Sequence, residues 1–592
     1  METTKIASTT INVALSAGLL TANFGAQAQT LPASTDAANA ARAAAQQNQL
    51  LDQQREARER ARVVNAPSVQ SSAPRAGAYP SLPAETPCFP IDRFSLDVPT
   101  LLPDAARRLG ASALPLDPFA FAQDWLSHYA GQCIGKRGIE TIVGALTETI
   151  LSRGYVTTRV LVPQQDVSSG ELKLTLIPGV IRALRFADPS MRGTWKTAFP
   201  ARSGDLLNLR ALEQGLEQMK HVSSQDVDMQ IVPTEQPGES DVVISVKRQK
   251  PWTFIASVDN SGTRATGKLQ GNVSIGIDNL LGLNDIFNAG ANQDLEFGDK
   301  TRGSHGWNAF YSIPYGFWTA TLSGNTNTYY QQIAGVNQTF VSSGNSQTLD
   351  LKIQRVLSRS QADVLGMEMR LTKRFGASYI EDTEITQQRR DNTFVEAGLT
   401  DRHFFGSTQF DGSLAYRQGI GWLGATPDTS AQTGGPTYRF KMAVLDANLS
   451  VPFQIASEAL RYVTSFHGQF TNDQLFYIDD LSIGSRYTVR GFDGETLLAS
   501  ERGFFWRNEL QIPIGSTGQS IYAGIDYGHV YGQNTAVLAG TQLAGAVIGF
   551  RGSAAAKFGS FAYDLFAGTP LYKPRTFPTA RVTVGFQLTS QF

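Results

Sequence analysis

The sequence predicts an all-β membrane protein: a sixteen-stranded antiparallel transmembrane β-barrel in the C-terminal part of the chain, preceded by two small α+β domains and an N-terminal helix. Helical hydrophobic periods disappear after Pro251, where turn clusters alternate with aromatic-rich runs. Charged residues make up 17% of the 592 residues, whereas soluble proteins have roughly 25%. No apolar run of about 18 residues follows the N-terminal segment, which disfavours a membrane helix.

Residues 1–28 have the features of an export signal. Lys5 supplies a positive charge, a weakly apolar stretch follows, and Ala26-Gln27-Ala28 provides small residues for cleavage. Serine and threonine dilute the apolar stretch, so a disordered N-terminus is the alternative. Export places the rest of the chain in an oxidising compartment.

The sequence contains two cysteines, Cys88 and Cys133. Two thiols are too few for a structural zinc site, and they do not form a Cys-x-x-Cys motif. In an oxidising compartment we expect one structural disulfide between them. Because it closes a long loop, chain entropy predicts a stabilisation of about 3–4 kcal/mol.

Residues 36–62 consist of strong helix formers without an apolar stripe, since Leu50 and Leu51 stand nearly alone. Such a helix is either a solvated spacer or an insert in a polar cavity. We place the helix within residues 29–62, and the Pro-, Ser- and Ala-rich linker that follows at residues 63–85.

Two successive units with the order β-α-α-β-β follow, at residues 86–178 and 179–248. In each unit a helix with one apolar face precedes two strand candidates with alternating apolar residues. The segment MRGTWKTAF, residues 191–199, is expected to form the short first helix of the second unit. The recurrence indicates a tandem repeat of small α+β domains.

The remaining residues, 249–592, alternate turns with strand candidates. In the final segment, RVTVGFQLTSQF, residues alternate with period 2, and the apolar parity runs from Val582 to Phe592. Sixteen strands would have about 21 residues each, enough for a spanning strand and a connection. A soluble all-β domain is the alternative, but export, aromatic content and missing helices agree with a barrel.

The segment IGSRYTVRGFDGETL, residues 483–497, has too many turn formers for a strand and lacks a helical period. It places Arg490 between Val489 and the pair Gly491-Phe492. A fixed arginine gains little in an exposed loop. We therefore expect its guanidinium to face a partner elsewhere in the chain.

The strand candidate SIYAGIDYGHVYG offers such a partner. Asp526 lies on the parity opposite the apolar face, which would point it into the lumen of a barrel. Gly524 and Gly528 flank it on the same face and let another backbone approach closely. An inward-folded loop could bring Arg490 beside Asp526 as a bidentate pair. The alternative is an unpaired arginine and an ordinary lumenal aspartate.

The sequence has no recognisable catalytic or ligand motif. The net charge is -1, from 51 basic and 52 acidic residues, which does not favour nucleic acid as a partner. Walker A and G-x-S-x-G motifs are absent, and the 6 histidines lack metal-ligand spacing. A G-x-G-x-x-G match at 419–424 precedes a loop instead of a helix. We predict no enzyme, no cofactor, no metal and no nucleotide.

In this order, the tandem units, TVRGF and DYG at 526–528 resemble the two-partner secretion transporters of the outer membrane (the TpsB family). RGYVTTRVLVPQQDVSSGELKLTLIPG looks like part of the family's first polypeptide-transport-associated (POTRA) domain, and residues 179–248 look like the second. The similarity covers nearly the whole mature chain and is greatest to the haemolysin and contact-dependent-inhibition branch. The family usually has an aromatic residue where this chain has Gly524.

The resemblance implies a function. The chain would be an outer-membrane translocase of a Gram-negative bacterium that exports a large partner exoprotein, bound in the periplasm by the POTRA domains, without nucleotide hydrolysis. Residues 29–62 would plug the pore, and Arg490 with Asp526 would hold the inward loop. Phe592 would be the C-terminal signal for insertion into outer-membrane lipid by the barrel assembly machinery. A barrel-assembly insertase of the same superfamily is the alternative; a porin would lack the POTRA-like units.

Overall fold

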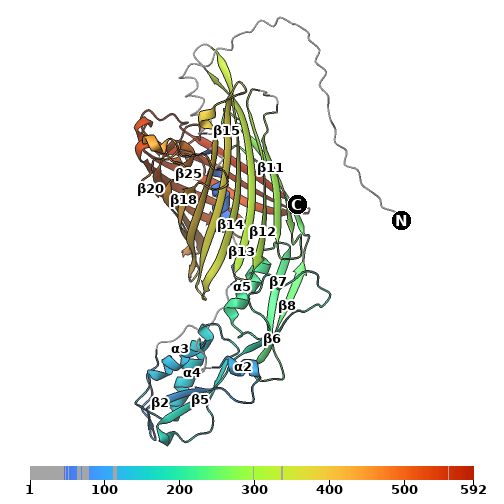
Figure 1. Ribbon diagram of the computed structural model, residues 1–592, viewed down its shortest axis with the longest axis vertical. Helices are drawn as coiled ribbons and strands as arrows, with labels where there is room; N and C mark the ends of the chain where they lie inside the picture. Colours follow the sequence, from blue (N-terminus) through green and yellow to red (C-terminus); the bar gives the residue numbers. More distant parts are fainter. Residues whose placement is uncertain are drawn as a thin grey trace, which may run out of the picture.

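The chain forms a wide β-barrel with two smaller domains stacked beneath it in the computed structural model (Figure 1). The structure describes residues 46, 49–50, 53–62, 64, 68–69, 79–110, 117–297, 299, 301–334, 338–557 and 559–592. The predicted export signal, residues 1–28, lies outside the described residues. The predicted helix and linker are described only in part.

The first small domain packs helices against a three-stranded sheet with the order β2-β5-β4. Its elements are β1 (Phe89–Ile91), β2 (Arg93–Asp97), α2 (Asp104–Arg108), α3 (Ala120–Ser127), β3 (Gln132–Ile134), α4 (Lys136–Ser152), β4 (Arg159–Leu161) and β5 (Glu171–Ile177). The apolar face of α4, with Ile142, Leu146 and Ile150, packs in the core as its period predicts. A disulfide joins Cys88 to Cys133, beside the paired strands β1 and β3.

The second small domain has a sheet with the order β6-β8-β7 and one helix. Its elements are β6 (Val180–Phe186), α5 (Leu209–Lys220), β7 (Gln225–Pro233) and β8 (Glu239–Arg248). The predicted helix at 191–199 is wrong: this segment forms turns. Gly193 has a φ of 94° and Pro200 follows, so few residues remain for a helix, and Phe199 is buried in the core instead.

The barrel contains sixteen long antiparallel strands, each paired with its neighbours, and it closes between β27 and β9. The strands are β9 (Trp252–Asp259), β10 (Gln270–Asp278), β11 (Ile286–Asp294), β12 (Gly303–Tyr315), β13 (Trp318–Ala334), β14 (Thr339–Arg359), β15 (Asp363–Ile380), β17 (Arg390–Phe405), β18 (Thr408–Ile420), β19 (Lys441–Ile455), β20 (Glu458–Thr471), β23 (Arg502–Pro513), β24 (Gln519–Tyr531), β25 (Gln542–Ala556), β26 (Gly559–Tyr572) and β27 (Thr583–Gln591). The two-residue strand β16 (Thr383–Glu384) adds to the end of β15. The predicted fold class is confirmed.

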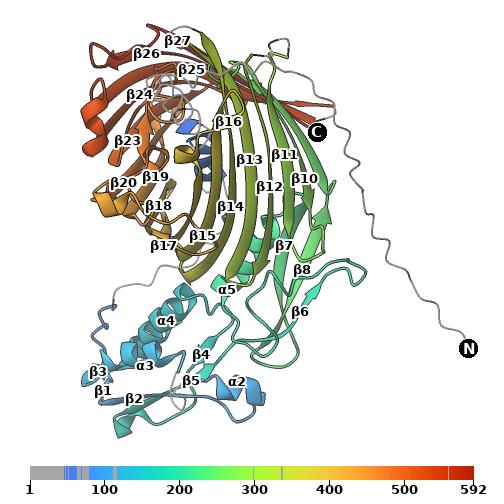
Figure 2. The ribbon, with the colours of Figure 1, turned by 45° about the horizontal axis from the view of Figure 1, so that its top comes forward.

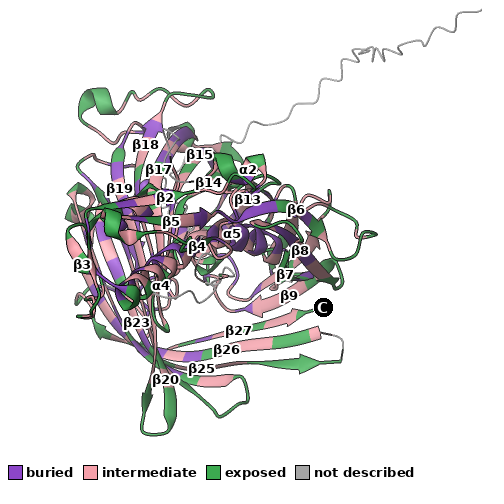
Figure 3. Ribbon diagram, turned by 90° about the horizontal axis from the view of Figure 1, so that it is seen from below, coloured by how far each residue is buried: buried purple, intermediate pink, exposed green. Residues whose placement is uncertain are grey.

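The two faces of the barrel wall differ as period-2 strands require. Outward side chains are largely apolar and exposed, among them Val273, Ile275, Leu322, Leu351, Leu399, Leu414, Ile525, Ile548 and Val584. Figure 3 shows the barrel strands β25–β27 as mostly exposed or intermediate, whereas α5 is largely buried. Among the residues that the structure describes, no helix is both long and apolar enough to cross a membrane.

The polar N-terminal helix lies inside the barrel. Its described helical residues are 46, 49–50, 53–62 and 64, and Figure 2 shows it (blue) within the ring of strands. We call residues 53–62 the plug helix. Its polar surface fits a polar lumen better than lipid.

The disulfide generates a prediction for the stability of the first domain. Cys133→Ser should lower its free energy of unfolding by about 3–4 kcal/mol, because the open loop gains entropy when unfolded. Hydrogen exchange of α4 amides in the full chain measures this loss. The amides of α5 are the control, since the second domain has a core of its own. Unchanged protection of α4 would contradict the prediction.

Candidate functional site

The loop between β20 and β23, residues 472–501, folds into the barrel; we call it the inward loop. It contains a short hairpin, β21 (Leu481–Ile483) with β22 (Leu498–Ser500). Apolar side chains of the loop pack against the barrel strands in one buried cluster, formed by Leu481, Ile483, Val489, Phe492, Leu498, Phe505, Val530, Leu543 and Phe577. The loop is therefore anchored to the wall by packing as well as by polar contacts.

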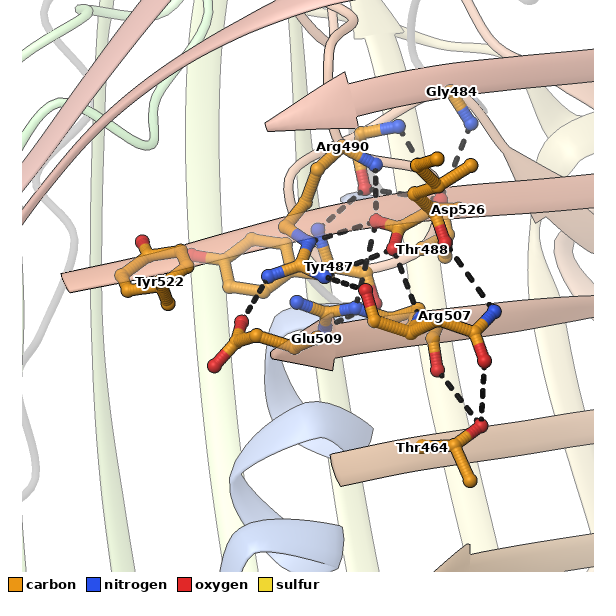
Figure 4. Close-up of polar contacts among 12 residues, drawn as sticks. Thr464, Gly484, Tyr487, Thr488, Arg490, Arg507, Glu509, Tyr522 and Asp526 are labelled. Carbon is orange, nitrogen blue, oxygen red and sulfur yellow. Dashed lines mark hydrogen bonds and ion pairs between the residues drawn. The ribbon is translucent and has the colours of Figure 1, made fainter. Parts of the chain in front are cut away.

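Arg490 lies in a turn of the inward loop and faces Asp526 on β24 (Figure 4). Its Nε donates to Asp526 Oδ2 at 2.7 Å, its Nη2 donates to Oδ1 at 2.9 Å, and its backbone N–H donates to Oδ2 at 2.9 Å. The side chains are 5% and 0% exposed. The geometry is a buried bidentate pair, in which charge-assisted bonds fix both side chains.

A second carboxylate completes the shell around the arginine. Arg490 Nη1 also pairs with Glu509 on β23, and Nη2 donates to the backbone oxygen of Asn508 at 3.4 Å. Asp526 Oδ1 accepts from Asn508 N at 3.3 Å, and Arg507 Nε lies 3.8 Å from Asp526 Oδ2. Arg490 thus joins the loop to two neighbouring strands at once.

Four glycines form the surface on which the loop lies; we call them the glycine floor (Gly524, Gly528, Gly545 and Gly568). They come from β24, β25 and β26. A Cβ at Gly524 would lie 2.7 Å from Arg490 Nη2, and one at Gly545 would overlap the Arg490 carbonyl oxygen. The absence of an aromatic residue at position 524 therefore has a physical reason in this chain: the arginine occupies that space.

The neighbours of Arg490 in the motif also contact the glycine floor. A Cβ at Gly528 would lie 2.8 Å from Val489 Cγ2, and one at Gly568 would lie 2.8 Å from Gly491 Cα. Gly491 has a φ of 103°, a backbone conformation that is unfavourable for residues with a Cβ atom. Phe492 is 1% exposed and packs edge-on against Phe577.

The plug helix and the residues before it contact the inward loop. Gln53 Nε2 donates to Ser482 O at 3.0 Å and to Ser482 Oγ at 2.6 Å, while Ser485 Oγ donates to Gln53 Oε1. Gln49 Nε2 donates to Tyr477 O at 2.6 Å. The inward loop is therefore bound to the barrel wall and also contacts the plug helix.

The plug helix also pairs with charged residues of the wall. The ion pairs are Arg55 with Asp350 at 3.6 Å, Glu59 with Arg370 at 3.0 Å and Arg60 with Asp446 at 4.0 Å. All three wall residues lie on β14, β15 and β19. Arg58 Nη2 also donates to Asn272 Oδ1 on β10 at 3.3 Å, and the Arg62 guanidinium lies over the Phe310 ring on β12. The helix therefore contacts more than one side of the lumen, and its ion pairs with the wall lie on β14, β15 and β19.

A buried arginine connects the barrel to the second domain and to the N-terminal segment. Arg359, at the end of β14, is 2% exposed. Its guanidinium donates to Glu217 Oε2 at 2.5 Å, to Gln214 Oε1 at 3.0 Å and to Val69 O at 2.6 Å. Val69 N in turn donates to Glu217 Oε2 at 3.1 Å. Val69, which precedes the first domain in the chain, is therefore held between α5 and the barrel.

Phe592 lies next to the closing seam of the barrel. Its backbone N–H donates to Phe254 O at 2.8 Å, and Phe254 N donates to Phe592 O at 3.2 Å. The two rings are 6.2 Å apart. The C-terminal residue thus extends the pairing of β27 with β9.

The sequence pattern missed three kinds of contributor to the site. Glu509 shares the inward parity of β23 with Arg507, so alternation could have singled it out. Gly545 and Gly568 are glycines inside strands, a sign of close backbone approach. Arg359 had no local signal, because its partners lie far away in the chain.

Comparison with known proteins gives consistent matches. Residues 238–552 match the family model "Haemolysin secretion/activation protein ShlB/FhaC/HecB", residues 110–179 match a ShlB-type POTRA domain, and residues 180–233 match a POTRA domain. Outer membrane transporter CdiB-2 of Burkholderia pseudomallei is 67% identical over 96% of this chain and 97% of its own length. Hemolysin transporter protein ShlB of Serratia marcescens is 27% identical over 76% of this chain and 78% of its own. The structure of CdiB from Acinetobacter baumannii matches with a TM-score of 0.80 and 26% identity, over 93% of this chain and 99% of that one.

The buried pair predicts how the inward loop responds to substitution. Arg490→Ala removes the bidentate partner of Asp526, which retains Arg507 at 3.8 Å, whereas Glu509 retains Arg551 at 2.8 Å. Breaking the buried pair should cost about 3–5 kcal/mol. We expect the barrel to insert while amides of residues 485–497 lose hydrogen-exchange protection. Arg490→Lys is the matched variant: it keeps the charge but loses the bidentate hydrogen bonds. Its hydrogen-exchange protection at residues 485–497 should therefore lie between those of the wild type and the alanine variant. Wild-type protection in the alanine variant would contradict this role.

The glycine floor makes a separate prediction. Gly545→Ala should displace the inward loop although every charged group remains, because the methyl group would overlap the Arg490 carbonyl oxygen. Gly324→Ala on β13 is the control, since the nearest atom to its Cβ would be 3.8 Å away. Protease sensitivity of the inward loop distinguishes the two. Equal sensitivity of both variants would show that the floor does not set the loop's position.

Proposed function

This chain belongs to the ShlB/FhaC/HecB family of haemolysin secretion/activation proteins, and on that premise we propose how it exports its partner. It is an outer-membrane transporter of the two-partner secretion type, with its POTRA domains in the periplasm. The observation that carries the mechanism is a closed barrel whose polar lumen holds a pinned loop and a polar helix.

The POTRA domains capture the exoprotein while it is unfolded. Each domain has a small sheet with two edges, β2 and β4 in the first domain and β6 and β7 in the second. An extended segment can add to such an edge through backbone hydrogen bonds, which suits a partner of varied sequence. The second domain lies against the barrel through α5 and Arg359, so captured chain starts close to the pore.

The plug helix leaves the lumen to open the pore. Its contacts are hydrogen bonds and partly exposed ion pairs, which exchange readily. The exoprotein then threads outward and folds at the cell surface, and this folding supplies the driving free energy without nucleotide hydrolysis. The transporter carries out no catalysis of its own.

Arg490 and Asp526 hold the inward loop while the polypeptide passes. A loop that stays attached to β23 and β24 keeps its backbone out of the path and maintains the shape of the conduit. Phe592, next to the seam, serves as the signal by which the barrel assembly machinery inserts the chain into outer-membrane lipid.

Co-expression tests this function. The transporter is produced together with each large exported protein of the same bacterium, and the culture medium is assayed. We expect one exoprotein to appear outside only when the transporter is present, and deletion of residues 88–248 to abolish its release while the barrel still inserts. Arg490→Ala should reduce release as well. General loss of other outer-membrane proteins on depletion, with no exoprotein released, would contradict the proposal.

A further inference from the structure

The inward-facing side chains of β10–β13 form a wall with almost no charge. Because residues alternate between faces, the exposed outward positions Ile275 and Leu322 define the parity of the lumenal face. We call the following residues the uncharged wall: Asn272, Ser274, Asn288, Asn292, Ser304, Asn308, Ser323, Asn325 and Asn327. The structure describes all residues of these strands. The charged residues on this face are Asp278 and Asp294, which lie at the ends of β10 and β11.

Those two carboxylates accept hydrogen bonds from neighbouring residues. Asp278 Oδ2 accepts from Ser223 Oγ and Ser224 N of the second domain, each at 2.8 Å. Asp294 Oδ2 accepts from Ser304 N at 2.9 Å. The length of wall between them presents amides, hydroxyls, glycines and the ring of Phe310 to the lumen.

The stretch of wall from β15 to β20, which follows β14 in the barrel, is densely charged; we call it the charged wall. Its charges are paired with one another, as Arg417 Nε with Glu396 Oε2 at 2.6 Å and Arg402 Nε with Asp411 Oδ1 at 2.6 Å. His467 Nδ1 lies 2.8 Å from Asp446 Oδ1. The lumenal wall therefore has an uncharged stretch and a charged stretch, besides the strands that the inward loop covers.

Cavities flank the plug helix on both sides. One of about 160 Å³ lies between the helix and the uncharged wall, with Asn308, Ser323 and Asn325 in its lining. Another of about 310 Å³ lies against the charged wall. The first cavity extends as far as Asn392 on β17, at the edge of the charged wall.

A translocating polypeptide needs a surface that it can leave as easily as it binds. Amide and hydroxyl side chains both donate and accept, so they satisfy any backbone group that passes and exchange partners without a net charge to separate. A charged wall would retain each segment of the exported polypeptide that carries the opposite charge. Binding such a segment would also break the ion pairs within the wall. The chemistry favours one side for transport.

We propose that the uncharged wall, which the plug helix covers through the contact of Arg58 with Asn272, is the binding track along which the extended backbone of the exported polypeptide moves once the helix has left. The charged wall supplies the ion-pair partners Arg370 and Asp446 of the helix. This rests on the proposed function. It deepens that function by assigning the substrate to one side of the lumen, through backbone hydrogen bonds to asparagine and serine side chains.

Site-specific cross-linking tests the proposal in the full-length transporter. The cysteines of the mature chain are joined in the disulfide, so Ser323→Cys or Ser413→Cys introduces a single free thiol, the first on the uncharged wall and the second on the charged wall. The probe is the exoprotein identified by co-expression, with one cysteine and a stably folded C-terminal domain that stalls it in the pore. Ser323→Cys should form several-fold more mixed disulfide.

A charge substitution provides the second measurement. Asn325→Asp places a carboxylate on the uncharged wall and should slow release of the exoprotein by about threefold, the effect of one partly screened ion pair. Asn448→Asp on the charged wall is the matched control and should release at the wild-type rate. The proposal is overturned if Ser413→Cys cross-links as well as Ser323→Cys, or if the two aspartate variants release equally. If wild-type protein exports no exoprotein, the proposed function fails instead.

Discussion

The buried bond between Arg490 and Asp526 is the constraint on which the arrangement of the lumen depends. A loop inside a barrel brings polar backbone away from solvent and must be held against its own conformational entropy. The bidentate pair, at 5% and 0% exposure, does this at one point, and Glu509 connects the same guanidinium to the next strand. The plug helix then uses the loop as one of its supports, through Ser482 and Ser485.

That bond requires a floor without side chains. Arginine reaches Asp526 with its backbone N–H as well as its guanidinium, so the main chain of the loop must come close to the barrel wall. Gly524 and Gly545 permit this approach, and Gly491 supplies the backbone turn. The glycines and the ion pair therefore form one structural unit. The glycines allow the loop to approach the wall, and the ion pair holds it there.

Period-2 alternation was enough to predict the barrel, its polar lumen and the inward direction of Asp526, because parity is a local property of strands. Apolar helical faces likewise predicted α4 and α5. The segment 191–199 was mispredicted as a helix, since the burial of Phe199 depends on a domain core that local preference does not describe. Arg359 and the roles of Gly545 and Gly568 depend on contacts between distant segments, which one sequence without relatives does not reveal.

The exposures of the lumenal contacts order the steps by which the pore can open. The pairs that hold the plug helix to the wall range from Arg55 with Asp350, at 18% and 6% exposure, to Arg370 with Glu59, at 16% and 35%. Contact with water weakens such pairs relative to a fully desolvated one. The pair that holds the inward loop is fully desolvated, and breaking it leaves a buried charge behind. Under the proposed function, the helix leaves while the loop stays on the glycine floor. An open pore reached in this order keeps the loop against β23–β26 and exposes the uncharged wall on the other side of the lumen.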